Sequence, residues 1–165
     1  MFGKPSPKDS TVVHRFDQVV RDPVASIFTV QANKGIILSG ATLPSLKHPS
    51  GVEVSSSDSS FTIMIAVADD LPLTQSKKLW LCALSRAENQ GMAWDKDRRT
   101  VGNKWGTGPA LVLGVKAKIK LPGDATWKVE ALDPSGAPKA VIAEKTNDFR
   151  IDPSQKTCWW LITRE

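Results

Sequence analysis

Residues 61–67 read Phe-Thr-Ile-Met-Ile-Ala-Val, a run in which nearly every side chain is apolar. Helical periodicity is absent, and both faces of the run are mostly apolar, which is typical of a fully buried strand. Residues 78–85, Lys-Leu-Trp-Leu-Cys-Ala-Leu-Ser, have the same character. The sequence therefore predicts two buried strands at the centre of the fold, with the Trp80 side chain in the core.

Further strand signals lie on both sides of this pair, separated by turn clusters. In residues 111–121, apolar side chains alternate with Lys116, Lys118 and Lys120, which predicts one half-buried strand with a wet face. Asp133-Pro134-Ser135-Gly136 has the residue types of a tight turn. Shorter strands are expected at 26–31, 35–40, 52–54, 127–132, 141–143, 149–151 and 158–163.

This pattern predicts an all-β fold, a single β-sandwich of jelly-roll or immunoglobulin-like kind with about nine or ten short strands. There is no alternation of strands with helices. Residues 25–165 are expected to form the sandwich, and residues 1–24 an N-terminal arm or linker in which residues 12–20 form a strand or a helical turn on the body.

The amino-acid composition excludes several classes of protein. The 165 residues are 41% hydrophobic and 24% charged, as in an ordinary globular domain. No apolar run approaches the ~20 residues of a membrane helix, and residues 1–10 lack the apolar region of a signal peptide. Cys82 and Cys158 have no metal-ligand spacing, so they are expected to be buried free thiols or one disulfide between neighbouring strands.

The segment 86–109, Arg-Ala-Glu-Asn-Gln-Gly-Met-Ala-Trp-Asp-Lys-Asp-Arg-Arg-Thr-Val-Gly-Asn-Lys-Trp-Gly-Thr-Gly-Pro, has no clean period. A long irregular loop in a compact domain usually serves a function. The sequence contains no nucleophile elbow, phosphate-binding loop or dinucleotide fingerprint. It predicts neither an enzyme nor a bound metal or cofactor, and this segment becomes the candidate binding site.

The residue types in this segment suit carbohydrate. A sugar ring stacks on a Trp face, and planar polar groups bind its hydroxyls. We expect Trp94 and Trp105 to stack, unless both rings plug the sandwich. The polar residues expected to orient hydroxyls are Glu88, Asn89, Asp95, Asp97, Arg98 and Arg99.

Two other interpretations remain open. Residues 77–128 carry a net charge of +7, whereas the whole chain carries +5, and this excess predicts, as one alternative, contact with an acidic polysaccharide. The lysines at 116, 118 and 120 have no aromatic neighbours, which argues against nucleic acid and favours a solvated face. A small glycosidase would need paired carboxylates such as Glu88 and Asp95, but ion pairs within the loop are the simpler expectation.

The central segment resembles a C-terminal β-sandwich region that follows the (β/α)8 catalytic domain of some bacterial glycoside hydrolases. The resemblance rests on Ser85-Arg86-Ala87-Glu88-Asn89, on Gly91-Met92-Ala93-Trp94-Asp95 and on Trp105-Gly106-Thr107-Gly108-Pro109. Residues 127–136 and 156–160 are similar to the last strands of that region, and 27–30 to its first. Where relatives have Thr-Ala-Val-Ala before the Arg, this chain has Leu81-Cys82-Ala83-Leu84-Ser85.

The resemblance implies an accessory domain, not a catalytic one, and it implies that the parent protein is a secreted, extracellular enzyme. We therefore expect a carbohydrate-binding module for a neutral plant β-glucan, cellulose or xylan-type polysaccharide. The partners expected are the polysaccharide and a glycoside hydrolase catalytic domain, with no nucleic acid and no membrane. The alternative is a structural domain that packs on the catalytic barrel, which predicts buried Trp94 and Trp105 and an exposed apolar patch elsewhere.

Overall fold

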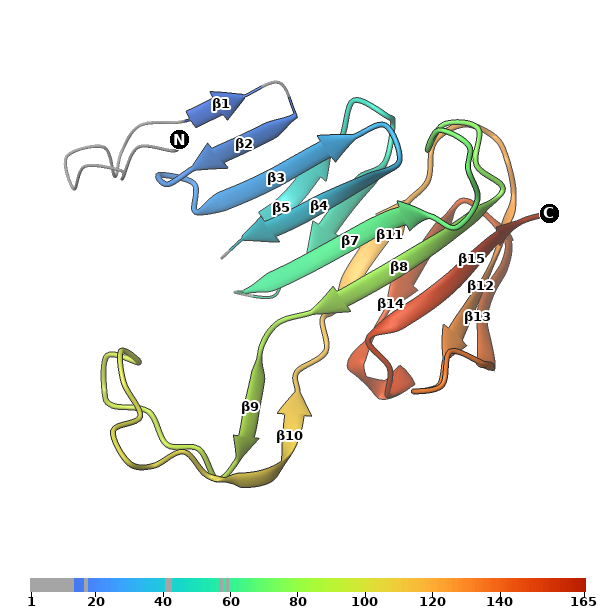
Figure 1. The fold of residues 1–165 in the computed structure, drawn as a ribbon. Helices are drawn as coiled ribbons and strands as arrows, with labels where there is room; N and C mark the ends of the chain where they lie inside the picture. The colour runs from blue at the N-terminus through green and yellow to red at the C-terminus, as the bar shows by residue number, and fades with distance from the viewer. Residues whose placement is uncertain (1–13, 17, 41–42, 57, 59) are drawn as a thin grey trace.

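The computed structural model describes residues 14–16, 18–40, 43–56, 58 and 60–165. These residues form an all-β fold in which two sheets face each other and a two-stranded ribbon extends away from them (Figure 1). All neighbouring strands are antiparallel. Within the described residues, no helix has the length and apolar character needed to cross a membrane.

The larger sheet has nine strands. In spatial order they are β1 (His14–Phe16), β2 (Val19–Asp22), β3 (Ile27–Ala32), β4 (Gly35–Gly40), β7 (Phe61–Val67), β8 (Lys78–Leu84), β15 (Trp159–Arg164), β12 (Trp127–Leu132) and β13 (Pro138–Thr146). The strand β15 therefore lies between β8 and β12, two strands that are remote from it in the sequence.

The smaller sheet has four strands, in the order β14 (Asp148–Ile151), β11 (Ala117–Lys120), β6 (Glu53–Ser56) and β5 (Leu43–Lys47). It lies behind the larger sheet in Figure 1. The ribbon, residues 86–113, contains β9 (Ala87–Gln90) and β10 (Thr107–Val112), which among the described strands pair only with each other.

The core lies between the two sheets. The larger sheet contributes side chains such as Ile63, Leu81 and Trp160, and the smaller sheet contributes Val54 and Ile119, all almost fully buried. Because side chains alternate along a strand, the residues between these point to the outer faces of the two sheets. Burial of these aliphatic and aromatic side chains, each worth roughly 1.5–3 kcal/mol, is the main stabilising contribution.

Many of the predicted strands are confirmed, and the bounds of β4, β7 and β12 match the expected ranges. The described residues form fifteen strands, more than the expected nine or ten. Residues 14–16 and 19–22 are strands that extend the large sheet, whereas residues 1–13 of the expected N-terminal arm lie outside the described residues. Cys82 and Cys158 are free, half-buried thiols.

Three expectations were wrong. Residues 111–121 do not form one strand, because β10 ends at Val112 in the ribbon and β11 begins at Ala117 in the smaller sheet. The segment 86–109 is not irregular throughout, since β9 and the start of β10 lie within it. Trp80 is not in the core; its ring is 37% exposed on the outer face of the larger sheet. In β8 both faces are apolar, so alternation alone did not distinguish the inner face.

Candidate functional site

The residues expected to bind a ligand lie in and around the ribbon. A glycine lies at each end of the loop 91–106. Gly91 and Gly106 both have positive φ, at 75° and 70°. A Cβ on Gly106 would meet the Gln90 carbonyl and would lie 2.6 Å from the Met92 amide nitrogen, so no larger residue fits there.

Trp105, next to this glycine, is 61% exposed. Its backbone is nevertheless fixed, because the Asn89 side-chain amide donates to the Trp105 carbonyl at 3.1 Å. The preceding Lys104 amide donates to Val101, and the Lys104 carbonyl accepts from Ala93. Val101 is the loop's buried apolar residue, at 7% exposed. The backbone therefore holds an exposed indole in a defined position.

Trp94 is less free. It is 38% exposed, and the Arg98 guanidinium lies 5.0 Å from the centre of its ring. The same guanidinium donates to Glu88 at 2.5 Å, and Glu88 also pairs with Arg86 at 3.2 Å. One face of Trp94 is thus occupied by a cation that is held in place from β9.

The other loop acids and bases differ in what they contact. The Asp95 carboxylate accepts from the Arg99 amide at 2.7 Å, and the Asp95 amide donates to the Thr100 carbonyl at 2.9 Å. The Asp97 and Arg99 side chains are exposed and form no ion pair with another described residue. All eight predicted residues lie between Glu88 and Trp105, and contacts join Asn89 to Trp105, Arg98 to Trp94 and Glu88, and Asp95 to the Arg99 amide. Glu88, Asn89, Asp95 and Arg98 therefore hold the loop itself.

A second surface is apolar, as the structural-domain alternative predicted, although the sequence did not indicate its residues. Cross-strand pairing aligns Val30, Ile37, Met64, Cys82 and Trp159 on the outer face of the larger sheet, and we call this set the apolar row. All of these side chains are partly exposed. Trp80 stacks on Trp159, with ring centres 6.5 Å apart. Burial of the thiol raises the pKa of Cys82, so this row carries little charge.

The apolar row leads to a cleft at the base of the ribbon. The cleft has a volume of about 600 Å³. Leu113 and Val112 form its ribbon side, and Trp159, Pro134 and Pro153 form its body side. The Trp159 ring is fixed there by a 3.1 Å hydrogen bond from its Nε1 to the Asp133 carbonyl. Apolar side chains predominate, which suits a hydrophobic ligand or a protein surface.

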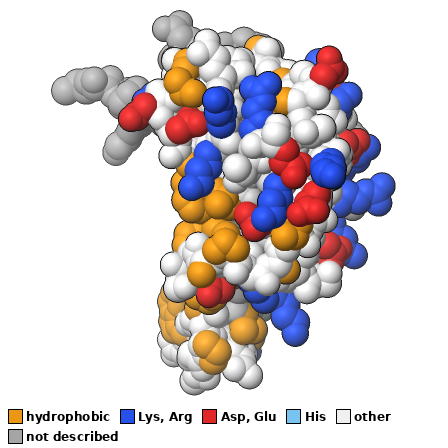
Figure 2. Space-filling view, turned by 90° about the vertical axis from the view of Figure 1, so that its right-hand side faces the viewer, with side chains coloured by type: hydrophobic (Ala, Val, Ile, Leu, Met, Phe, Trp, Pro, Cys, Tyr) orange, Lys and Arg blue, Asp and Glu red, His pale blue; other side chains and the backbone are white. Residues whose placement is uncertain are grey.

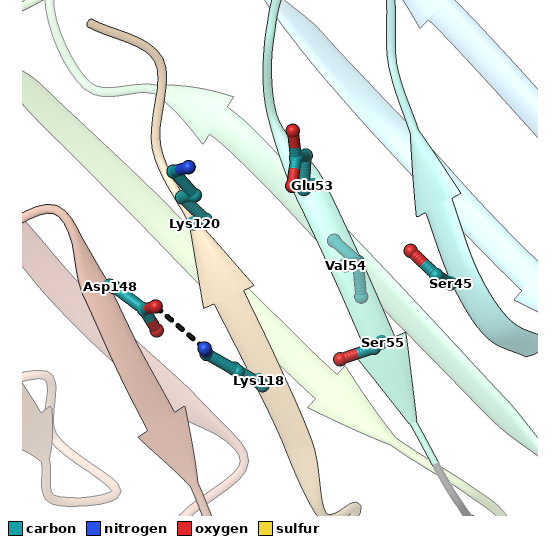
Figure 3. Close-up of a pocket in the computed structure, with 7 residues that line it drawn as sticks. All are labelled: Ser45, Glu53, Val54, Ser55, Lys118, Lys120 and Asp148. Carbon is teal, nitrogen blue, oxygen red and sulfur yellow. Dashed lines mark ion pairs between the residues drawn. The ribbon is translucent and has the colours of Figure 1, made fainter.

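The outer face of the smaller sheet has the opposite character. Pairing across its four strands aligns Asp148, Lys120, Glu53 and Lys47, so that charges alternate in sign. Lys118 reaches diagonally to Asp148 at 2.7 Å beside a small polar pocket (Figure 3). The hydrogen bond and positive charge from Lys47 lower the pKa of Glu53. The expected solvated face is confirmed, with acids from neighbouring strands among its lysines.

Figure 2 shows this contrast from the side. Hydrophobic side chains gather along the left and lower parts of the view, on the side of the larger sheet and ribbon. Lysines and arginines alternate with acids over the right half. A face of mixed charge is well solvated, whereas a continuous apolar face marks a surface of interaction.

The described residues include no group of three His, Cys, Asp or Glu side chains placed to hold a metal ion. Both carboxylates considered for a glycosidase, Glu88 and Asp95, already accept hydrogen bonds within the ribbon. His48 is 5% exposed and bonds through Nδ1 to Ser50, in a turn remote from the loop.

Comparisons with protein-family models, with curated proteins and with solved structures find no match for this chain.

Proposed function

We propose that the chain is a non-catalytic carbohydrate-binding module for a neutral plant polysaccharide of β-glucan or xylan type. The observation that carries the proposal is Trp105, an indole 61% exposed on a backbone fixed by Asn89 and Gly106. Leaving a large apolar ring in water is unfavourable unless a ligand covers it. A sugar ring, with its apolar C–H face, is such a ligand.

The polar part of the site is smaller than the sequence suggested. Asp97 and Arg99 remain available to bind hydroxyls, and the free face of Trp94 is a second stacking surface. The other four predicted residues position these groups. Affinity of a single site is expected in the range of about micromolar to millimolar, because hydrogen bonds to a solvated sugar return little net free energy.

The proposal also includes the parent protein in which the domain occurs. The ribbon motifs resemble those of accessory regions in bacterial glycoside hydrolases, so we place the chain in a secreted parent enzyme beside a catalytic barrel. A jelly-roll or immunoglobulin-like sandwich belongs to this proposal. Linkage to an enzyme would raise the local concentration of its substrate.

A second candidate function is a structural domain that packs on the catalytic barrel. It is favoured by the apolar row and by the cleft at the base of the ribbon. This alternative predicted buried Trp94 and Trp105, and both rings are exposed. Binding of a polyanion is less favoured, because acids alternate with the lysines of the smaller sheet.

Native affinity electrophoresis tests the proposal, with xyloglucan, mixed-linkage β-glucan, xylan, galactomannan and a charged pectin in the gel. We expect a neutral β-glucan or xylan to retard the protein, and Trp105→Ala to abolish the retardation. Trp80→Ala is the matched control, since it removes an exposed indole from the sheet and not from the ribbon.

Three results would count against this proposal. Retardation by none of the polymers would favour the structural domain. Retardation by pectin alone, lost in high salt, would favour the basic segment. Equal loss in Trp80→Ala and Trp105→Ala would place the sugar on the sheet and not on the ribbon.

A further inference from the structure

The strand β10 has one open edge. It pairs with β9 on one side only, and within the described residues no strand lies on its other side. The Leu113 amide donates to the Arg86 carbonyl at 2.8 Å, on the side of β9. Backbone groups alternate in direction along a strand, so the amides and carbonyls of Ala110 and Val112 point to the open side.

From Ala110 to Val112 this edge lacks the usual protection against strand pairing. Residues 107–112 include no charged side chain, and all six are exposed. The edge strand β13 is different: it begins with Pro138, carries Lys139 and Lys145, and has three register shifts against β12. Charges, prolines and bulges are the devices by which proteins prevent edges from pairing. The proline of β10 and its register shift both lie at the start of the strand, between Thr107 and Ala110, so the edge from Ala110 to Val112 is regular and carries no charge.

The ribbon also needs support. A two-stranded hairpin is marginally stable on its own, and three or more strands are normally required. This ribbon projects from the body (Figure 1) and leaves Leu111, Val112 and Leu113 between 42% and 52% exposed. A partner strand would supply the missing hydrogen bonds and cover part of this apolar surface.

From these observations we propose that two copies of the chain pair through β10. The two β10 strands would run antiparallel about a two-fold axis and form a four-stranded sheet in the order β9, β10, β10 of the partner, β9 of the partner. A two-fold axis makes an antiparallel pair self-complementary. An uncharged strand meets its own copy without like-charge repulsion. The outer edges of the new sheet are then the β9 strands, which carry the charged Glu88.

A second copy fits this edge better than an unrelated peptide. An uncharged edge offers an unrelated peptide no charge pattern to recognise. The β10 strand of a second copy, in contrast, matches this edge in length and apolar character. Since the ribbon extends away from the two sheets, the two bodies would lie at opposite ends of the shared sheet. The inference goes beyond sugar binding and does not depend on it.

Light scattering coupled to size-exclusion chromatography tests the pairing over a wide range of protein concentration. We expect a concentration-dependent species at twice the 17.9 kDa of the chain. Val112→Lys should weaken dimerisation by about tenfold or more, because the lysine appears twice in one interface. Val141→Lys on β13 is the matched control, since Val141 is 48% exposed and Val112 52%.

Hydrogen exchange gives an independent readout. In the dimer the amides of Ala110 and Val112 should exchange more slowly than in the Val112→Lys monomer, with the Leu111 amide little changed. A monomer at every concentration would overturn the proposal. So would a dimer that persists in Val112→Lys with unprotected Ala110, because the interface would then lie elsewhere.

Discussion

Arg98 stacks on Trp94 and at the same time donates a hydrogen bond to Glu88. One guanidinium thus joins the loop to the strand β9 and covers the ring face that a sugar would otherwise use. Trp94 and Trp105, which are equivalent in the sequence motif, are therefore different in the structure: one ring is partly covered and the other is free.

Removal of this guanidinium should loosen the loop without unfolding the domain. In Arg98→Gln, we expect faster hydrogen exchange at the Arg99 and Gly102 amides. The free energy of unfolding should change by less than about 1 kcal/mol, since exposed ion pairs and cation–π contacts are weak. Arg99→Gln is the control and should leave exchange unchanged. A fall in the free energy of unfolding well beyond this range in Arg98→Gln would contradict the prediction, because the loop would then be energetically coupled to the core.

The conformation at Gly106 should control the position of Trp105. Gly106→Ala introduces a Cβ against the Gln90 carbonyl at a φ of 70°, so the turn must move. We expect lost retardation by any polysaccharide that binds the wild type, with cooperative unfolding of the domain retained. Gly102→Ala is the matched control, because Gly102 also has positive φ, at 51°, but open space around it. It should cost only about 1–2 kcal/mol of local strain. Equal effects of both substitutions would show that φ alone matters.

Stability should fall as the pH drops below neutrality because of His48. Burial lowers the pKa of His48, and its Nε2 has no hydrogen-bond partner among the described residues. The unfolded state, with a pKa near 6.5, therefore takes up a proton more readily than the folded state. The stabilising difference is complete above the unfolded pKa and is lost as the pH falls through it toward the folded pKa.

Urea unfolding at several pH values between 7.5 and 5 measures this effect. The decline should flatten in His48→Gln and remain in His14→Gln, which removes the chain's other histidine. A decline over this pH range that survives in His48→Gln would contradict the prediction, because the acids with lowered pKa values, such as Asp133, do not titrate there. The hydrogen bond from Ser135 lowers the pKa of Asp133, so its contribution should be lost only at more acidic pH.

Two buried tryptophans should respond differently to substitution by Phe. The Nε1 of Trp127 has no hydrogen-bond partner among the described residues, whereas Nε1 of Trp160 donates to Gln155 at 3.0 Å. Both rings are nearly inaccessible, at 4% and 1% exposed. Trp160→Phe loses a hydrogen bond, whereas Trp127→Phe removes an unsatisfied donor. We expect Trp127→Phe to be less destabilising by about 1–3 kcal/mol in urea unfolding. The reverse order would mean that packing of the Trp127 ring is dominant.

The strands of the two sheets were predictable where local pattern and tertiary position agree. The run 61–67 is apolar on both sides and is central, and the alternation of Ala117 and Ile119 with lysines matches a sheet with one wet face. Sequence pattern failed at Leu111–Leu113, whose apolar character resembles a core strand although these residues lie on the ribbon. Periodicity reports which residues are apolar, but not whether a second layer covers them.

The sequence predicted which segment contains the candidate site. It did not predict which residues of that segment are free to bind a ligand and which hold the loop. Glycines and tryptophans at irregular spacing correctly marked the loop 91–106. The expected ion pairs within the loop are confirmed for Glu88, which pairs with Arg86 and Arg98, but no local signal indicated which acid would pair with which base. The apolar row was missed because its members come from five strands, and their alignment depends on register.

The position of β15 has a consequence for synthesis of the protein. Residues 159–164 lie between β8 and β12, so the large sheet is two separate pieces until these residues have left the ribosome. The nascent chain meanwhile exposes the pairing edge of β8, with its apolar side chains. Closure of the sheet is then a late, non-local event. The nascent chain should therefore bind chaperones mainly after β8 has been translated and before β15 has been released.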